Sequence, residues 1–234
     1  MTDLIQVTNV YKIYHEGEDN EVRALDNVSA NIAHGEFVAI LGSSGSGKST
    51  FMNIIGCLDV PTYGDYILHG KEVSTMTDRE LSKIRNLDIG FIFQGFNLIH
   101  ALDAIENVEL PLIYRGMRKA ERRKLAFAAL QRVGLAERIY HRPNEMSGGQ
   151  QQRVAIARAI AAQPPIIMAD EPTGNLDSKS GKDVMEILTN LNNEGHTIIL
   201  ITHDADIAAM AKRTIQIHDG HVIRDTAKEG TICP

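Results

Sequence analysis

The segment that most constrains this chain is residues 42–49, which read Gly-Ser-Ser-Gly-Ser-Gly-Lys-Ser. It follows the apolar run 37–41, so it lies between an expected buried strand and a helix expected to begin near Lys48. In this G-x-x-x-x-G-K-[ST] pattern the glycines let several backbone N–H groups converge on one anion, and the helix start adds its positive dipole end. A Gly/Ser-rich turn can also be a flexible connector, but that reading leaves the Lys-Ser pair unexplained.

The residues of this loop are therefore candidates for binding phosphate. Lys48 is expected to supply a point charge to the β- and γ-phosphates, and the Ser49 hydroxyl is expected to hold Mg²⁺. The full candidate set is Gly42, Ser43, Ser44, Gly45, Ser46, Gly47, Lys48, Ser49 and Thr50. The loop predicts a nucleoside triphosphate as ligand, but it does not predict what the energy drives.

Composition excludes some partners. The 234 residues suffice for one domain, with or without a subdomain, and the net charge of −6 gives no support for nucleic-acid binding. Two cysteines, Cys57 and Cys233, without metal-type spacing favour a reducing compartment. The start shows no secretory signal, and apolar runs such as 198–201 are too short to span a bilayer, so another chain is expected to cross any membrane involved.

Strand and helix patterns alternate along the chain, which predicts an α/β fold with a parallel core sheet. The expected strands are 4–14, 22–32, 37–41, 66–68, 89–93, 166–169 and 197–201, followed by a hairpin of 214–217 and 221–223. Helices are expected at 48–57, 118–133, 147–162 and along 184–191, ending before Gly195. The mainly helical block from about 97 to 163 predicts an inserted subdomain.

Two carboxylates, Asp170 and Glu171, end the apolar run 166–169. Ligands of open α/β sheets bind at the carboxyl ends of strands, where the phosphate loop also lies. Because successive strand residues point in opposite directions, the two acids should have different tasks. We expect Asp170 to bind Mg²⁺ through water and Glu171 to orient or deprotonate the attacking water. The alternative is that Asp-Glu-Pro merely ends a strand at a turn.

Two further polar residues follow expected strands. His203 comes after 197–201 and could hydrogen bond a γ-phosphate oxygen. Gln94 closes the strand before the helical block and could reach Mg²⁺ or the attacking water while linking two parts of the chain. In isolation, a lone histidine is more often structural and a loop glutamine has no special task, so both assignments depend on the neighbouring motifs.

Residues 147–150, Ser-Gly-Gly-Gln, form a second candidate anion site. Ser147 and Gln150 have the S-x-x-Q form of a capping box, but that reading does not explain Gly148 and Gly149. Each glycine costs a helix about 1 kcal/mol relative to alanine, so the pair predicts a poor cap. It also predicts a good anion site, because bare backbone N–H groups can approach a phosphate closely.

One nucleotide does not obviously need two anion sites in the same chain. A head-to-tail pair of chains resolves this, because residues 147–150 of each copy would close on the nucleotide held by residues 42–49 of the other.

Taken in order, these motifs resemble the nucleotide-binding subunit of ATP-binding cassette (ABC) transporters over nearly the whole chain. That family calls them Walker A, Q-loop, signature, Walker B, D-loop and H-loop; here they are 42–49, Gln94, 147–150, 170–171, 175–177 and His203. The family's signature usually starts with Leu, and Met146 replaces it here by another apolar residue.

The resemblance implies one ABC ATPase domain over residues 1–234. Its fold would be a P-loop NTPase core with a parallel sheet, an N-terminal antiparallel β subdomain and an inserted α-helical subdomain. ATP and Mg²⁺ would be its cofactors. The family also implies an aromatic residue that stacks on adenine; Tyr11 and Tyr14 compete for that role, and the position after Lys12 favours Tyr14.

Segments 53–59, 90–94, 106–111 and 174–178 further resemble the MacB/LolD branch of the family. That branch implies an ATPase subunit that dimerises around two ATP–Mg²⁺. It would dock on a transmembrane permease near Gln94 and the helical block, at the inner face of the cell membrane. Export or extraction of a peptide, lipoprotein or drug-like substrate is the leading expectation.

Two alternatives remain at this point. One is an ATPase switch that regulates a membrane partner without moving a substrate. The other is a DNA-repair or ribosome-associated ATPase, which the negative charge and the lack of paired cassettes, zinc insertions or a long coiled coil disfavour.

Overall fold

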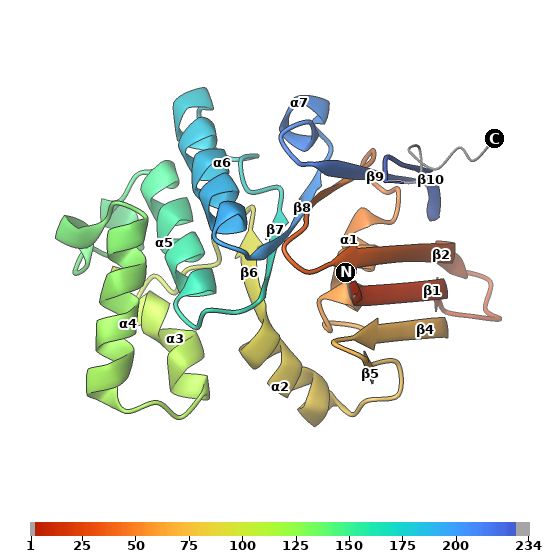
Figure 1. Cartoon of the computed structure of the whole chain (residues 1–234), viewed down its shortest axis with the longest axis horizontal. Helices are drawn as coiled ribbons and strands as arrows, with labels where there is room; N and C mark the ends of the chain where they lie inside the picture. The colour runs from red at the N-terminus through yellow and green to blue at the C-terminus, as the bar shows by residue number, and fades with distance from the viewer. Residues whose placement is uncertain (1–2, 228–234) are drawn as a thin grey trace. The chain divides into compact units, whose positions relative to one another are not determined.

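The computed structural model describes residues 3–227, which form two compact units (Figure 1). The first unit combines the described residues of Met1–Arg85 and Thr197–Pro234, and the second is Asn86–His196. Cys233, to which the sequence assigns no role, lies outside the described residues.

An antiparallel sheet forms the N-terminal part of the first unit. Its strand order is β2-β1-β4-β5, with bounds β1 Asp3–Tyr14, β2 Val22–Ala33, β4 Tyr63–Leu68 and β5 Lys71–Glu72. The strands expected at 4–14 and 22–32 are thus confirmed within one residue at each end. Residues along one face of β1 and β2, such as Ile5, Val7 and Ile32, are buried in the core.

A mainly parallel group of strands completes the first unit. β3 Phe37–Leu41 lies between β8 Thr197–Thr202 and β9 Arg213–His218 and is parallel to both. The hairpin expected near the C-terminus is confirmed, since β10 His221–Asp225 pairs antiparallel with β9. All six residues of β8 are buried, which explains why this strand reads as an almost uninterrupted apolar run.

Short helices connect these strands. α1 Lys48–Ile55 leaves the glycine-rich loop and ends two residues before the expected Cys57, which adopts a left-handed φ of 56°. α7 Ala205–Ala208 lies against β3 and β8. α2 Asp78–Asp88 was not expected from the sequence, because its apolar residues are few and Leu81 is the one that is buried.

The second unit pairs two parallel strands with four helices of 11 to 16 residues. Its elements are β6 Ile89–Phe93, α3 Ala104–Tyr114, α4 Lys119–Arg132, α5 Gly148–Ile160, β7 Ile166–Asp170 and α6 Ser178–Asn193. Two short 3₁₀ turns, Ala136–Arg138 and Pro143–Glu145, precede α5. α5 packs against α3, α4, α6 and β6, and Figure 1 shows α3, α4 and α5 side by side.

The segment 97–163 contains α3, α4 and α5 and no strand, although the compact unit that includes it is wider. Within the described residues, no helix combines the length and apolar character that a membrane crossing requires.

Candidate functional site

The glycine-rich loop is held close to two neighbouring strands of the first unit. A Cβ atom at Gly47 would lie 2.5 Å from the Ala24 carbonyl oxygen, and one at Gly42 would lie 2.3 Å from the Ile217 carbonyl oxygen. Gly47 also has a φ of 102°, which only glycine adopts readily. These contacts explain why residues without side chains occupy both positions.

The α1 helix begins without a side-chain cap. Its N-cap is Gly47, and no acidic residue lies in its first turn. Lys48 is only 8% exposed, and its Nζ donates a hydrogen bond of 2.7 Å to the Ser43 carbonyl oxygen. The first-turn N–H groups and the lysine ammonium therefore belong to one small region with positive character.

A pocket of about 340 Å³ opens beside this loop, within the range of volumes that small-molecule sites occupy. It is lined by Val22, Arg23, Ala24, Gly45, Gly47, Lys48, Ser49, Thr50, Asp219 and Gly220. The buried Ser46 hydroxyl oxygen of the same loop has no hydrogen-bond partner among residues 3–227. A phosphate oxygen would satisfy such a donor, so the loop fits the expected ligand.

The two candidate tyrosines have different surroundings. The Tyr14 hydroxyl interacts with the Thr50 side chain of α1 and donates a hydrogen bond of 3.3 Å to an Asp59 carboxylate oxygen. Burial raises the pKa of Tyr14, and the Asp59 carboxylate raises it further. The Tyr11 ring instead contacts the Tyr63 ring edge-on, with 6.5 Å between centroids. Tyr14 is therefore linked to the phosphate-loop helix, whereas Tyr11 is linked to β4.

His203 lies at the same sheet edge as the loop. The last residues of β3 and β8, Leu41 and Thr202, are partners in the parallel ladder. Gly42 and His203 follow those partners directly, so the expected juxtaposition at the carboxyl ends of the strands is present within the first unit.

The second unit contains an equivalent edge. Phe93 and Asp170 are ladder partners at the ends of β6 and β7, so Gln94 and Glu171 both follow this edge. The expectation that Asp170 and Glu171 alternate along one strand is wrong in detail. Asp170 is the last strand residue, whereas Glu171 has left the strand with a left-handed φ of 44°. The turn, rather than strand alternation, separates the two carboxylates.

Gln94 is fixed by the loop that precedes α6. The Asn175 Nδ2 donates a hydrogen bond of 3.0 Å to the Gln94 carbonyl oxygen, and the Gln94 Nε2 donates to the Asn175 Oδ1 at 3.4 Å. A Cβ atom at Gly174 would lie 2.7 Å from the Gln94 Nε2. The side chain therefore packs on bare backbone.

The start of α5 corrects the expectation of a poor cap. The Ser147 hydroxyl accepts a hydrogen bond of 3.3 Å from the Gln150 N–H, and the Gln150 side-chain oxygen accepts one of 3.0 Å from the Ser147 N–H. The capping box is complete despite the two glycines, because the box uses the residues on either side of them.

The two glycines have different surroundings. A Cβ atom at Gly149 would lie 2.6 Å from the Ser180 hydroxyl oxygen, so packing of α5 against α6 requires glycine there. A Cβ atom at Gly148 would meet no atom closer than 3.6 Å. Gly148 is thus the one glycine of the pair for which packing gives no reason, and its bare backbone still fits an anion-binding role.

Among residues 3–227 no group of three or more His, Cys, Asp or Glu side chains could hold a metal ion. Mg²⁺ is usually held by one or two protein carboxylates together with substrate phosphates and water, rather than by a complete protein cage. The oxygen donors of Ser49, Gln94 and Asp170 are of the type that Mg²⁺ prefers.

Three contributing residues had no functional signal in a local motif. Asp219 and Gly220 line the pocket beside the loop, although they lie about 170 residues away in the sequence. Arg158 contacts the loop after Gln94; its one available signal was a charge inside the apolar stretch 154–160.

The family model described as ABC transporter matches residues 25–174, which is more than half of the chain. The chain belongs to the ABC transporter family. The expected fold is confirmed, and as a member of this family the chain is an ATPase domain that works with ATP and Mg²⁺.

Several ABC proteins are similar in sequence. The macrolide export ATP-binding/permease protein MacB of Chlorobaculum tepidum is 55% identical over 226 residues, covering 97% of this chain and 34% of that protein. The chain thus spans about a third of the length of the MacB proteins that it matches. The uncharacterized ABC transporter ATP-binding protein YknY of Bacillus subtilis is 51% identical, covering 94% of this chain and 95% of YknY.

Solved ABC structures share the fold. The ATP-binding cassette MJ0796, in a dimeric post-hydrolysis state bound to ADP and Pi, superposes with a TM-score of 0.87 at 50% identity. The alignment covers 94% of this chain and 97% of the MJ0796 chain.

Proposed function

We propose that this chain is the ATP-hydrolysing subunit of a transporter and acts as a homodimer. In this proposal residues 1–234 form one ABC-type ATPase domain with a helical subdomain at about 97–163. Two copies, arranged head to tail, enclose two ATP molecules and power a membrane partner. The observation that carries the proposal is the pair of glycine-rich helix starts, an uncapped one at α1 and a second at α5.

The α1 side holds the triphosphate. The backbone N–H groups of residues 42–50 surround the phosphates, and Lys48 moves its ammonium from the Ser43 carbonyl to the β- and γ-phosphate oxygens. Tyr14 stacks on the adenine, because it is the tyrosine linked to α1 through Thr50.

The metal and the attacking water would be bound by residues at the ends of strands together with Ser49 of α1. Ser49, Gln94 and Asp170 would hold Mg²⁺, and the bound ion would supply positive charge to neutralise the phosphate oxygens. Glu171 orients the attacking water and accepts its proton. His203 hydrogen bonds a γ-phosphate oxygen and so responds to whether that phosphate is present.

The α5 side acts on the partner's nucleotide. The start of α5 is partly open to solvent. Ser147 is exposed, Gly148 and Gln150 are half-buried, and Gly149 is buried. No acidic residue lies in the first turn of α5 to repel a phosphate. The Ser147 hydroxyl and the first-turn N–H groups bind the γ-phosphate of the ATP held by the other copy. Closing the dimer therefore requires ATP, and loss of the phosphate reopens it.

The names of relatives support a membrane partner and export. MacB is named as a macrolide export ATP-binding/permease protein, and PvdT of Pseudomonas fluorescens, 54% identical, is named as a pyoverdine export ATP-binding/permease protein. Export or extraction of a peptide, lipoprotein or drug-like substrate, which the resemblance to the MacB/LolD branch implies, remains the proposed task, and these names support the export part of it. The chain is placed in the cytoplasm, on the inner face of the membrane, through its permease.

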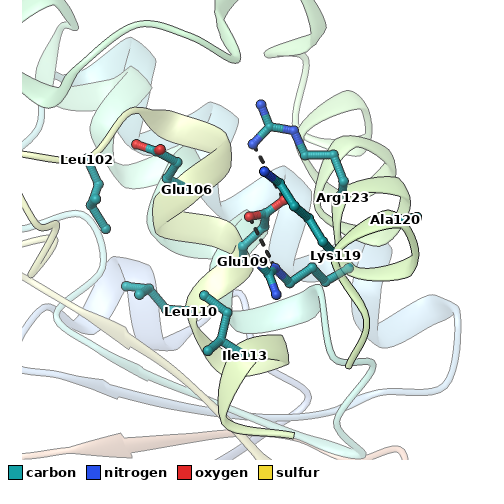
Figure 2. A pocket seen from close by; sticks show the side chains of 9 residues that line it. Leu102, Glu106, Glu109, Leu110, Ile113, Lys119, Ala120 and Arg123 are labelled. Carbon is teal, nitrogen blue, oxygen red and sulfur yellow. Dashed lines mark hydrogen bonds and ion pairs between the residues drawn. The ribbon is translucent and has the colours of Figure 1, made fainter. Parts of the chain in front are cut away.

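Figure 2 shows the surface proposed for that permease, a pocket of about 730 Å³ between α3 and α4. Leu102, Leu110 and Ile113 give it apolar walls, and charged side chains complete the lining. Glu109 is only 4% exposed and pairs with Arg122 at 3.4 Å and Arg123 at 3.5 Å, which ties α3 to α4. A pocket with both apolar and charged lining residues suits a short amphipathic helix.

Hydrolysis by the purified chain tests the proposal. Because only the dimer is competent, the rate per chain should rise with chain concentration, and EDTA should abolish it. A rate per chain that is independent of concentration at the lowest measurable values would contradict the shared sites. Reconstitution with the permease in vesicles then separates transport from the alternative, a regulatory switch, since only a transporter moves substrate in proportion to ATP consumed.

A further inference from the structure

The loop that follows Gln94 has a strained backbone. Phe96 and Asn97 have φ angles of 60° and 49°, in the left-handed region that non-glycine residues rarely enter. Such conformations are unfavourable for residues other than glycine and persist where the surroundings hold them. Two in succession therefore require an explanation from the residues around the loop.

Arg158 of α5 supplies the contact that holds this loop. Its guanidinium donates hydrogen bonds of 2.5 Å to the Asn97 carbonyl oxygen and 2.8 Å to the Phe96 carbonyl oxygen. The two strained residues are thus the two whose carbonyls meet the planar fork of one arginine. Hydrogen bonds from a charged donor are about twice as strong as neutral ones, which suits them to offset strain.

No other role in the described structure accounts for Arg158. It forms no ion pair with an Asp or Glu side chain among residues 3–227, and burial lowers the pKa of its guanidinium. A half-buried cation without a carboxylate is costly unless its donors are used. Here they are used by the loop carbonyls.

The same loop touches two functional elements of the second unit. At its start, Gln94 exchanges two hydrogen bonds with Asn175. At its middle, the Phe96 ring lies beside the first turn of α5, since a Cβ atom at Gly148 would be 3.7 Å from the Phe96 Cζ. A shift of this loop would therefore move Gln94 and disturb the start of α5.

We infer that Arg158 is a positioning residue for ATP hydrolysis, holding residues 94–97 in their strained form so that the Gln94 amide stays oriented toward Mg²⁺. The inference rests on the proposed role of Gln94. In this inference Arg158 acts through the loop, because its guanidinium binds the carbonyl oxygens of Phe96 and Asn97.

Arg158→Gln should lower kcat by about 10–100-fold, because a small misplacement of a positioned group is costly. The KM for ATP should change less than about twofold, since the residues of the α1 loop are unaffected. The Mn²⁺ concentration that half-saturates the chain loaded with a non-hydrolysable ATP analogue, measured by electron paramagnetic resonance without turnover, should rise. Arg153→Gln, the same change on the same helix but away from this loop, is the matched control and should leave all three values unchanged. Equal effects of the two variants would overturn the inference.

A double-mutant cycle separates this inference from the proposed function. If Arg158 acts through Gln94, Arg158→Gln should add little to the defect of Gln94→Ala. Multiplicative defects would overturn the inference and leave the role of Gln94 intact. An unchanged kcat in Gln94→Ala would overturn both.

Rescue at the loop tests the strain directly. Asn97→Gly removes the cost of the left-handed conformation, so it should restore part of the kcat lost in Arg158→Gln. No restoration would overturn the strain account. Where Arg158→Gln does not fold, Arg158→Lys keeps the charge but lacks the planar guanidinium group. It should lower kcat with little change in KM, by a smaller factor than Arg158→Gln. A wild-type kcat in the folded Arg158→Lys variant would overturn the inference.

Discussion

The helices α1 and α5 begin alike in sequence and differently in structure. Each first turn lacks an acidic residue, and each start contains glycine. α1 has the left-handed Gly47 as its N-cap and no side-chain cap, whereas α5 has Ser147 as its N-cap and a complete capping box.

The difference indicates a division of work between the two helix starts. The uncapped α1 offers its first-turn N–H groups, a buried lysine and an adjoining pocket, so it can bind a phosphate chain alone. α5 has already used the Gln150 N–H within its own cap, and its N-cap residue Ser147 is exposed. It is suited to complete a site that another chain has begun.

The variant with the largest expected effect separates ATP binding at the starts of α1 and α5 from ATP hydrolysis. Glu171→Gln removes the group proposed to accept the proton of water, so kcat should fall by about 10²–10⁴-fold while ATP binding survives. ATP should then trap the closed dimer, which size-exclusion chromatography would detect. Normal turnover in this variant would remove Glu171 from its role.

A smaller effect, on ATP affinity, tests which tyrosine belongs to the nucleotide site at α1. Tyr14→Ala should weaken ATP binding to the isolated monomer by about 10–100-fold, since stacking on a base contributes roughly 1–3 kcal/mol. Tyr11→Ala is the matched control and should bind ATP normally. Calorimetric titration of both variants decides the assignment, and the reverse order of affinities would transfer the stacking role to Tyr11.

The smallest effect concerns the α5 side and is structural. Gly149→Ala should lower the free energy of unfolding by about 1–3 kcal/mol, because the added Cβ would meet Ser180. Gly148→Ala should be nearly neutral for stability, as nothing lies within 3.4 Å of its Cβ. Denaturant unfolding measures both. Similar losses in the two variants would contradict the separate reasons given for the two glycines.

The sequence predicted the helices and strands whose burial produces a regular pattern of apolar residues. β3 and β8 were found because a strand covered on both faces is apolar throughout. α2 was missed because it is mostly exposed, and α3 because Pro111 lies inside it. The signal for α3 was instead at its start, where Asp103 and Glu106 form a capping box.

The candidate site was predictable in its residues and less so in its geometry. The motif residues lie at the strand ends and helix starts that the sequence predicted. The turn at Glu171, however, depends on a left-handed backbone conformation that the sequence does not predict. The Ser180 contact of Gly149 and the Arg158 contact with the Gln94 loop join residues far apart in the chain, so they required the folded structure.

The central claim is that each ATP is bound by α1 of one chain and α5 of the other. Lys48→Ala disables the first element and Ser147→Arg the second, so each purified variant should hydrolyse ATP at background rates. Mixing the two creates one dimer site with an intact α1 loop from the Ser147→Arg chain and an intact α5 start from the Lys48→Ala chain. The account predicts that ATPase activity reappears on mixing and depends on the product of the two concentrations. A mixture that stays at background, or a Ser147→Arg chain that hydrolyses ATP alone, would contradict the account.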